Sequence, residues 1–574
     1  MILHNRFIGD WAMVWKSFVR DSWWFADTNM DAYYRPLQDV WFWLNYHLFG
    51  LAAPGWHLAM IAVHLLAVWL VFEIARDLTT GRWKPLFAAT LFGVMPVHAQ
   101  AVVQPTAIPL SMSAAFELAA FLCFLNRGNL GGMKRLWGLA LFAFALLGHE
   151  SAVIFPLLLV AYTVILEQSS KESIRDGLVR VTSQTWPFFA VLAGYFGLRL
   201  WVLGFISKQN FANSMSFMQV LMTLPSVLAL YLELLVMPWI AGPPEHPIKI
   251  VSSVLSRDFY FPLAVLAAVA LAAVRAIWRA SHCRLYLFWI VWMVVALLPV
   301  LNLRVFPPWG LVQDRYLYLS SVGWCLMVAD IGVAIFEGAP FGTLATVFSA
   351  TLVVALYAGL LFQIETFFHD DVSLFSVSVQ RFPNSWFGHF QLGKALKDRG
   401  DFADAEREYR AAMDINPDYP FGLINFAALL EETGHIPEAL DVLRRAVVLM
   451  PQWKFKLDSY INIANNADSL GAADLRESAL DEGANLPGAR TAVAKVRAQI
   501  EIKNGDFAEA ETVLLASSRE DPGDAEVWAL LASARARQGK RPQAIDACQR
   551  ALALKPSQGL REVLEKLLVQ LRAG

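Results

Sequence analysis

Apolar residues dominate the first two thirds of the chain and then become much less frequent. Up to about residue 365 the sequence consists of long apolar runs joined by short polar links, and beyond that point it is rich in Ala, Glu, Arg and Asp. A helix needs about 20 apolar residues to cross the hydrocarbon core of a bilayer. The pattern therefore predicts an all-α protein, in which a polytopic membrane domain precedes a soluble domain.

Eleven apolar runs are expected to enter the membrane. The runs at 136–148 and 152–166 are shorter than a usual span and are expected to extend into neighbouring residues. The predicted runs lie at residues 57–75, 85–103, 107–125, 136–148, 152–166, 186–203, 218–236, 259–278, 285–301, 317–336 and 343–362.

The distribution of Lys and Arg in the short links predicts the orientation of these runs. The links at 76–84, 126–135 and 167–185 each carry three basic residues, whereas the turns around His98 and His149 carry none. Basic links face the cytoplasm. Residues 1–56 and the two histidine turns are therefore expected outside.

One run decides the side of the C-terminal domain. The link at 275–284 is also basic, so it should face the cytoplasm. If this link and the earlier basic links all face the cytoplasm, the run at 218–236 cannot cross the membrane fully. This run has Pro225 in its middle and would then be re-entrant or interfacial. We favour this alternative, which places the C-terminal domain outside. If the run crosses fully, the C-terminal domain is cytoplasmic.

A 34-residue period begins at residue 386. Ala405 recurs as Ala439, and Pro417 recurs as Pro451. Small residues at fixed positions in paired helices, followed by a Pro, are typical of tetratricopeptide repeats. The predicted domains are an outer-face loop with a boundary helix (1–56), a membrane domain of about ten to eleven helices (57–365) and a repeat domain at 386–574. Its repeats are 386–419, 420–453, a degenerate 454–489, 490–524 and 525–558, followed by a C-terminal capping helix.

Composition excludes several classes of function. Only 17% of the residues are charged and the net charge is −2, so we expect no nucleic-acid partner. The four cysteines are scattered and form no CxxC pair, which predicts neither a disulfide framework nor a metal site. We expect no cofactor.

The aromatic stretch at residues 32–50 is typical of a helix at the boundary between lipid and water. It contains many rings together with Arg35, Asp39 and His47. Trp and Tyr favour the interface, whereas charges in mid-bilayer are costly. The guanidinium of Arg35 either binds a phosphate or anchors the helix through Asp39.

Polar groups in or beside the other runs are functional candidates by default. His98 is either a proton carrier at an outer cavity or a structural residue, and His149 with Glu150 either serves the site or joins two short helices. Arg199 requires a buried partner, which is either the substrate or the protein. Asp314 and Arg315, followed by Tyr316, form either an internal pair or a lipid-phosphate clamp.

Four segments resemble, in order, motifs of the transmembrane and tetratricopeptide-repeat O-mannosyltransferase family. "YYRPLQDVWFWLNYHLFGLAAPGWHLAMIAVHLL" resembles its YRPL…LNY…G…HL signature, and "LFGVMPVHAQAV" is similar to its HPxHxEAV turn. "HESAVIFPLLL" looks like its KExxxxxPLLL segment, and "DRYLYLSSVG" like its ERxLYLPSVG segment. The resemblance covers nearly the whole chain, including the repeats after the last run.

The resemblance implies a GT-C glycosyltransferase fold and a polyprenyl-phosphate sugar donor. Members transfer mannose to Ser or Thr hydroxyls outside the cytoplasm. Such a reaction needs a carboxylate to accept the hydroxyl proton and cations to stabilise the leaving phosphate. The candidate cations are Arg35, Arg199 and Arg315, and the candidate supporting residues are Gln100, His149, Asp314 and Tyr316.

The general base is the main departure from the family. Its acidic pair is expected upstream of Met1, after a first span, and Gln100 occupies the position of the family's Glu. Gln cannot act as a base. The remaining catalytic candidates are Asp10, Asp31, His98 and Glu150.

Two functions follow as expectations. The first is a membrane glycosyltransferase that moves mannose or another hexose from a polyprenyl phosphate to a protein or peptide, which the concave surface of the repeats would hold. The alternative is a non-catalytic, membrane-anchored repeat scaffold. Membrane lipids are expected partners in both cases, and the expected location is a bacterial inner membrane with periplasmic repeats.

Overall fold

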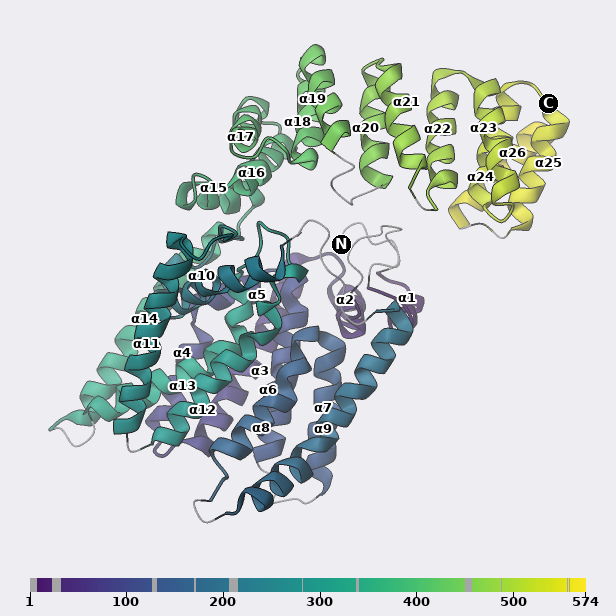
Figure 1. Cartoon of the computed structure of the whole chain (residues 1–574). Helices are drawn as coiled ribbons and strands as arrows, with labels where there is room; N and C mark the ends of the chain where they lie inside the picture. Colours follow the sequence, from purple (N-terminus) through teal and green to yellow (C-terminus); the bar gives the residue numbers. More distant parts are fainter. Residues whose placement is uncertain are drawn as a thin grey trace. The chain divides into compact units, whose positions relative to one another are not determined.

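The computed structural model describes residues 8–22, 33–125, 132–169, 172–205, 215–280, 282–336, 340–449, 457–486, 488–554, 556 and 558–573. Every regular element among these residues is a helix, so the predicted all-α class is confirmed. The chain divides into two compact units, Met1–Pro383 and Asn384–Gly574 (Figure 1).

The first unit is a bundle of long apolar helices. Among the described residues, eight helices are long and apolar enough to cross a membrane, or nine if a bent pair counts as one span. The helices of this unit are α1 (Trp11–Ser17), α2 (Pro36–Phe49), α3 (Ala53–Leu78), α4 (Trp83–Gly93), α5 (Ala99–Val103), α6 (Ile108–Leu125), α7 (Gly132–Gly148), α8 (Phe155–Ile165), α9 (Ile174–Leu203), α10 (Phe217–Val236), α11 (Arg257–Arg279), α12 (Cys283–Leu297), α13 (Leu317–Phe336), α14 (Gly342–Phe367) and α15 (Asp371–Arg381).

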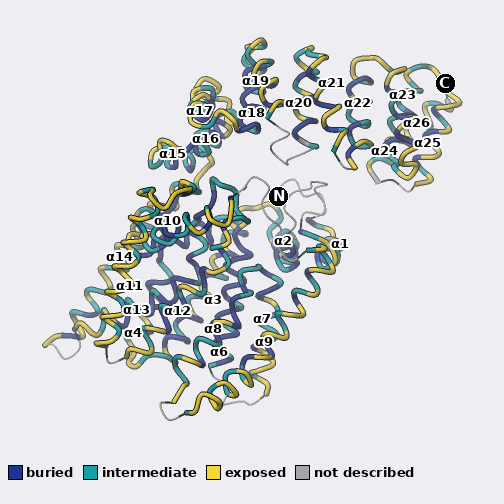
Figure 2. The backbone as a smooth tube through the Cα atoms, in the orientation of Figure 1, coloured by how far each residue is buried: buried dark blue, intermediate teal, exposed yellow. Residues whose placement is uncertain are grey.

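The outer helices of this bundle expose large apolar side chains. No residue of α11 is buried, and only 6% of the apolar window of α14 is buried. Leu271, Trp278 and Phe348 are 72%, 83% and 69% exposed, and Figure 2 shows exposed positions along both helices. A soluble protein rarely exposes apolar patches of this extent. These surfaces therefore face lipid, and the unit is a membrane domain.

The run predicted as one span at 85–103 is broken. α4 ends at Gly93, and the chain bends by 48° before the short helices η1 (Pro96–His98) and α5. Pro96 disfavours the α conformation of the residue before it, and Met95 accordingly has φ −67° and ψ 120°. The predicted run therefore consists of two helical pieces that meet at an angle. The break turns His98 and Gln100 into the interior.

α10 lies across the end of the bundle, although it is long and apolar enough to span a membrane. Ser226, in its middle, donates a hydrogen bond to the carbonyl of Asp258 in the first turn of α11, and Thr223 accepts one from the amide of Val251. Figure 1 also draws α10 at the upper end of the bundle. The re-entrant or interfacial alternative for this run stays a prediction.

The second unit consists of successive helix pairs. Gly400 and Gly505 end the first helix of their pairs with φ +92°, a backbone conformation that favours glycine. The recurring Ala405, Ala439 and Ala510 are fully buried, which allows close helix contact. The helices are α16 (Trp386–Arg399), α17 (Phe402–Ile415), α18 (Pro420–Glu432), α19 (Ile436–Leu449), α20 (Leu457–Ser469), α21 (Ala473–Ala484), α22 (Arg490–Asn504), α23 (Phe507–Glu520), α24 (Ala525–Arg537), α25 (Arg541–Ala553) and α26 (Gln558–Ala573).

Candidate functional site

The central contact of the candidate site joins Arg35 to Glu150. Arg35 directly precedes α2, and Glu150 begins the short helix η3 (Glu150–Ile154). The Arg35 Nε atom donates to Glu150 Oε2 at 2.8 Å, and its Nη2 atom donates to Oε1 at 2.5 Å. Two parallel bonds of this kind fix the orientation of both groups. The hypothesis that Arg35 pairs with Asp39 was therefore wrong, because Arg35 pairs with a carboxylate 115 positions away.

This pairing keeps Arg35 charged. Burial alone would lower the pKa of Arg35, but the charge and hydrogen bonds of Glu150 outweigh burial and raise it above its ordinary value. The guanidinium also lies 4.3 Å from the centre of the Tyr33 ring. Arg35 is therefore a fixed cation whose planar face is covered by an aromatic ring.

His149 is neutral at physiological pH. Burial and then the positive charge of Arg35, with smaller effects of Arg315 and Arg199, lower its pKa to about 3 against the opposing charge of Glu150. Its Nδ1 atom accepts a hydrogen bond from the amide of Ser151 at 3.1 Å. The positive charges of three arginines from distant parts of the sequence therefore all act on His149.

Arg199 lies on α9 with its side chain almost fully buried. Its Nη1 atom donates to the hydroxyl of Tyr195, one helical turn earlier, at 3.1 Å. Sequence reasoning required a buried partner for Arg199 and did not find Tyr195. The i, i+4 spacing of the two residues on one helix was the available signal.

Arg315 lies in the short helix η7 (Asp314–Tyr316), at the start of α13. Its amide donates to the side-chain oxygen of Gln100 at 3.3 Å, and its guanidinium carbon lies 5.5 Å from the centre of the Tyr316 ring. Gln100 is buried and therefore holds the backbone of Arg315 in place. In the part of the chain that the structure describes, no carboxylate pairs with the Arg315 side chain.

Asp314 does not neutralise its neighbour Arg315. Its Oδ1 atom lies 2.6 Å from the Nε2 atom of His246, and its Oδ2 atom accepts from the amide of Gly242 at 2.7 Å. The internal Asp314–Arg315 pair considered from the sequence was wrong, because both oxygens of Asp314 bond to the segment that follows α10. Sequence reasoning also missed His246, which stands in no recognisable motif.

Three catalytic candidates lie outside this cluster or outside the described residues. His98 is buried, bonds to the hydroxyl of Ser321 at 2.8 Å and lies 4.6 Å from the Tyr318 ring, so its predicted position at an outer cavity was wrong. Asp10 is an exposed cap of α1 and accepts a hydrogen bond from Ala12. Asp31 lies outside the described residues.

The cluster contains one arginine, Arg315, whose side chain has no carboxylate partner among the described residues. Glu150 pairs with Arg35, Arg199 lies near enough to act on the charge of Glu150, and His149 is neutral. No group of His, Cys, Asp or Glu in the described ranges could hold a metal ion. Charges at low dielectric interact strongly, so a cation without a carboxylate partner favours an anionic ligand.

Comparisons with known proteins agree with both units. The tetratricopeptide-repeat family matches residues 386–419 and 496–559. The chain is 25% identical over 438 residues to "Protein O-mannosyl-transferase F38B6.6" of Caenorhabditis elegans, covering 73% of this chain and 59% of that protein. It is 23% identical to "Protein O-mannosyl-transferase TMTC1" of Homo sapiens, covering 75% of this chain and 55% of that protein.

The chain thus spans about half the length of the curated relatives it matches. Among solved structures, it is 15% identical to "YrrB: a TPR protein with an unusual peptide-binding site", with a TM-score of 0.25 over 34% of this chain and 99% of that one. Fold and comparisons together define a helical membrane protein that carries tetratricopeptide repeats. Its relatives over most of the chain are named protein O-mannosyl-transferases.

Proposed function

We propose that this protein is a membrane glycosyltransferase that uses a polyprenyl-phosphate sugar as donor and a protein hydroxyl as acceptor. One observation carries the proposal: Arg35, Arg199 and Arg315 act on the same His149 turn, and the Arg315 side chain has no carboxylate partner among the described residues. The similarity to protein O-mannosyl-transferases supports mannose as the sugar.

The cluster suits a lipid-borne phosphate for two reasons. A guanidinium presents a planar fork of donors that matches phosphate oxygens. The cluster also belongs to a unit with lipid-facing helices, so a polyprenyl chain can lie in the bilayer while its phosphate reaches the arginines. Arg315 is the residue we assign to first contact with the phosphate, because its side chain has no carboxylate partner among the described residues.

Transfer of the sugar increases the negative charge on the phosphate. The acceptor hydroxyl oxygen bonds to the anomeric carbon and loses its proton to water. The bond from that carbon to the phosphate oxygen breaks, and its electron pair stays on that oxygen. Cations fixed beforehand stabilise this growing charge without reorganising. Arg35 is fixed by Glu150, and the backbone of Arg315 is fixed by Gln100. We therefore assign Glu150 to orienting Arg35 and Gln100 to orienting Arg315.

The repeats and the side of the membrane complete the proposal. The second unit would hold the polypeptide acceptor, as stacked helix pairs form extended concave surfaces. The basic links predict that the cluster faces away from the cytoplasm, which would place the reaction in the periplasm of a bacterium.

A transfer assay tests the proposed function. The purified chain in liposomes is incubated with radiolabelled polyprenyl-phosphate mannose and pooled peptides that contain Ser and Thr. We expect label on the peptides, and about a hundredfold slower labelling by an Arg315→Gln variant. Arg257→Gln is the matched control, because Arg257 is exposed and also lies over a ring of its own helix, that of Phe261.

A second candidate is a membrane-anchored scaffold without transfer activity. It is favoured by the pairing of Glu150, since a carboxylate held by two hydrogen bonds from Arg35 is a poor proton acceptor. Absence of labelling with mannose, glucose and arabinose donors would support the scaffold. Labelling that the Arg315→Gln and Arg257→Gln variants retain equally would reject the assigned site.

A further inference from the structure

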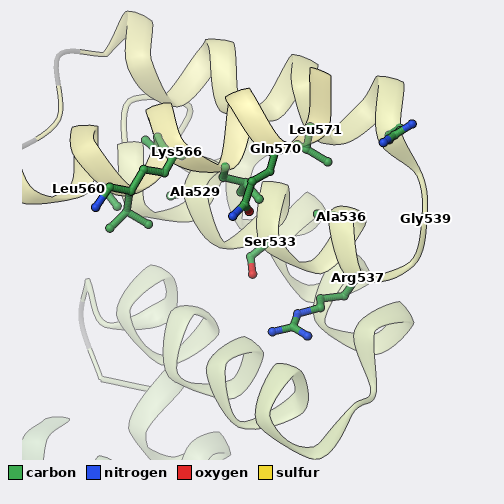
Figure 3. Close-up of a pocket in the computed structure, with 13 residues that line it drawn as sticks. Ala529, Ser533, Ala536, Arg537, Gly539, Leu560, Lys566, Gln570 and Leu571 are labelled. Carbon is green, nitrogen blue, oxygen red and sulfur yellow. The ribbon is translucent and has the colours of Figure 1, made fainter. Parts of the chain in front are cut away.

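A groove in the second unit lies between α24 and α26. Its volume is about 700 Å³, within the range of ligand-binding clefts. Figure 3 shows Ser533 and Arg537 of α24 on one side, with Lys566, Gln570 and Leu571 of α26 on the other. Neither helix belongs to the cluster of arginines in the first unit, so the groove is not part of the proposed donor site.

The floor of the groove is apolar. One of its two helices contributes small residues and the other contributes large ones. α24 lines it with the small residues Ala529, Ser533 and Ala536 at helical spacing. α26 lines it with a stripe of larger residues, which are Leu560, Val563, Leu564, Leu567 and Leu571. Val563 is 62% exposed, so part of the stripe faces solvent and is not covered by the described residues. Small residues opposite large ones leave room for apolar side chains of another segment.

The edges of the groove are basic. Arg537, Arg541 and Lys566 line it and are exposed, and no acidic residue lines it. None of the three forms an ion pair within the ranges that the structure describes. They contrast with Lys540 and Arg535 nearby, which both bond to Glu511.

The charge of the second unit changes sign at this end. Residues 525–574 hold nine Lys and Arg against four Asp and Glu, whereas residues 384–524 hold 15 against 24. An acidic ligand is therefore repelled by most of the unit and attracted to the end that contains the groove. A basic ligand would be drawn to the opposite end.

We propose that the groove between α24 and α26 binds an acidic protein segment, whose apolar side chains enter the groove while its carboxylates contact Arg537, Arg541 and Lys566. The stripe from Leu560 to Leu571 spans roughly 16 Å along the helix, which matches about five extended residues. The binding requires no sugar donor, so it stands or fails independently of the proposed transfer.

Fluorescence anisotropy with the full chain in nanodiscs tests this binding. The probe is a fluorescein-labelled peptide of about a dozen residues in which Glu and Asp flank three leucines. Its counterpart carries Gln and Asn instead. We expect saturable binding of the acidic peptide, at least about tenfold weaker binding of the counterpart, and loss of affinity at higher salt.

Charge reversal locates the site. The Arg537→Glu, Lys566→Glu double variant should bind the acidic peptide about tenfold more weakly. The matched control is Arg490→Glu, Arg519→Glu, which makes the same charge change on exposed helix positions of α22 and α23. If the double variant unfolds, the single Lys566→Gln variant, at an exposed position, should still weaken binding by about threefold.

Three outcomes would overturn the proposal. One is equal binding of the acidic peptide and its Gln and Asn counterpart, and another is an equal loss of affinity in the control variant. The third is salt-sensitive dimerisation of the chain that the groove variant abolishes and the peptide does not displace. In that case the occupant is the acidic surface of a second copy.

Discussion

The membrane unit contains two clusters of buried charge that differ in balance. Lys84 of α4 and Asp330 of α13 pair at 2.7 Å with side chains 9% and 3% exposed, and Tyr286 donates to the other oxygen of Asp330 at 2.5 Å. In the arginine cluster, the paired side chains of Arg35 and Glu150 are 16% and 32% exposed, and two further arginines are present.

This difference separates a structural contact from a candidate site. Lys84 and Asp330 neutralise each other, and a closed neutral pair needs no ligand. The arginine cluster is open to solvent at Glu150, and its Arg315 has no carboxylate partner among the described residues. A site that must release and rebind an anion cannot satisfy all its cations within the protein, so the unbalanced cluster is the one we assign to the donor.

The largest expected effect is on stability, at the balanced pair. Lys84→Ala leaves Asp330 charged and buried without its cation, which should cost about 3–5 kcal/mol of unfolding free energy. Unfolding in mixed micelles with increasing sodium dodecyl sulfate measures this loss. Replacing both partners, as Lys84→Met with Asp330→Leu, should recover most of it. If the double variant is as unstable as Lys84→Ala, the pair stabilises the protein by more than charge neutralisation.

The next effect is on donor binding, at the unbalanced cluster. Arg315→Gln should weaken binding of polyprenyl-phosphate mannose by about 1.5–3 kcal/mol, because a charged hydrogen bond to phosphate is lost. The free energy of unfolding of the Arg315→Gln variant should change little, because no carboxylate among the described residues loses a partner. Equilibrium binding of radiolabelled donor and the same micellar unfolding separate the two quantities. If Arg315→Gln lowers the free energy of unfolding as much as Lys84→Ala does, the two clusters do not differ as proposed.

A smaller effect is expected where Arg35 and Glu150 pair. Arg35→Lys keeps the charge but loses the planar fork, so one of the two hydrogen bonds to Glu150 disappears. Donor affinity should fall by about 1 kcal/mol. The same assay on Glu150→Gln shows whether orientation is the cause, because Gln still accepts one hydrogen bond. An unchanged affinity in both variants would exclude Arg35 from the donor site.

The smallest effect is a dependence of stability on pH. The pKa of His149 is about 3 in the folded chain and ordinarily 6.5, so the unfolded chain binds more protons between these values. Its contribution to stability is present above pH 6.5 and is lost as the pH falls toward 3. Lowering the pH from 7 to 6 should cost roughly 0.7 kcal/mol that a His149→Gln variant does not lose. Equal losses in both proteins would contradict the buried neutral state.

The sequence predicted features that depend on local spacing. Apolar runs indicated the long helices, and the repeated Ala405 and Ala439 indicated close helix pairs. It did not predict contacts between distant residues, such as Arg35 with Glu150 or Asp314 with His246, because neither local periodicity nor spacing reports them. It also missed the bend before Pro96, where one proline outweighs an apolar run. The roles of Arg35, Arg199 and Arg315 stay proposals.

Competition at the arginine cluster tests the central claim most directly. Radiolabelled polyprenyl-phosphate mannose is bound to the full chain in nanodiscs and displaced with either polyprenyl phosphate or the uncharged polyprenol. If the cluster holds the phosphate, polyprenyl phosphate should displace the donor at least about a hundredfold more effectively than polyprenol, and the Arg315→Gln variant should lose this preference. Equal displacement by both lipids would show that the chain recognises the polyprenyl tail and would contradict the account.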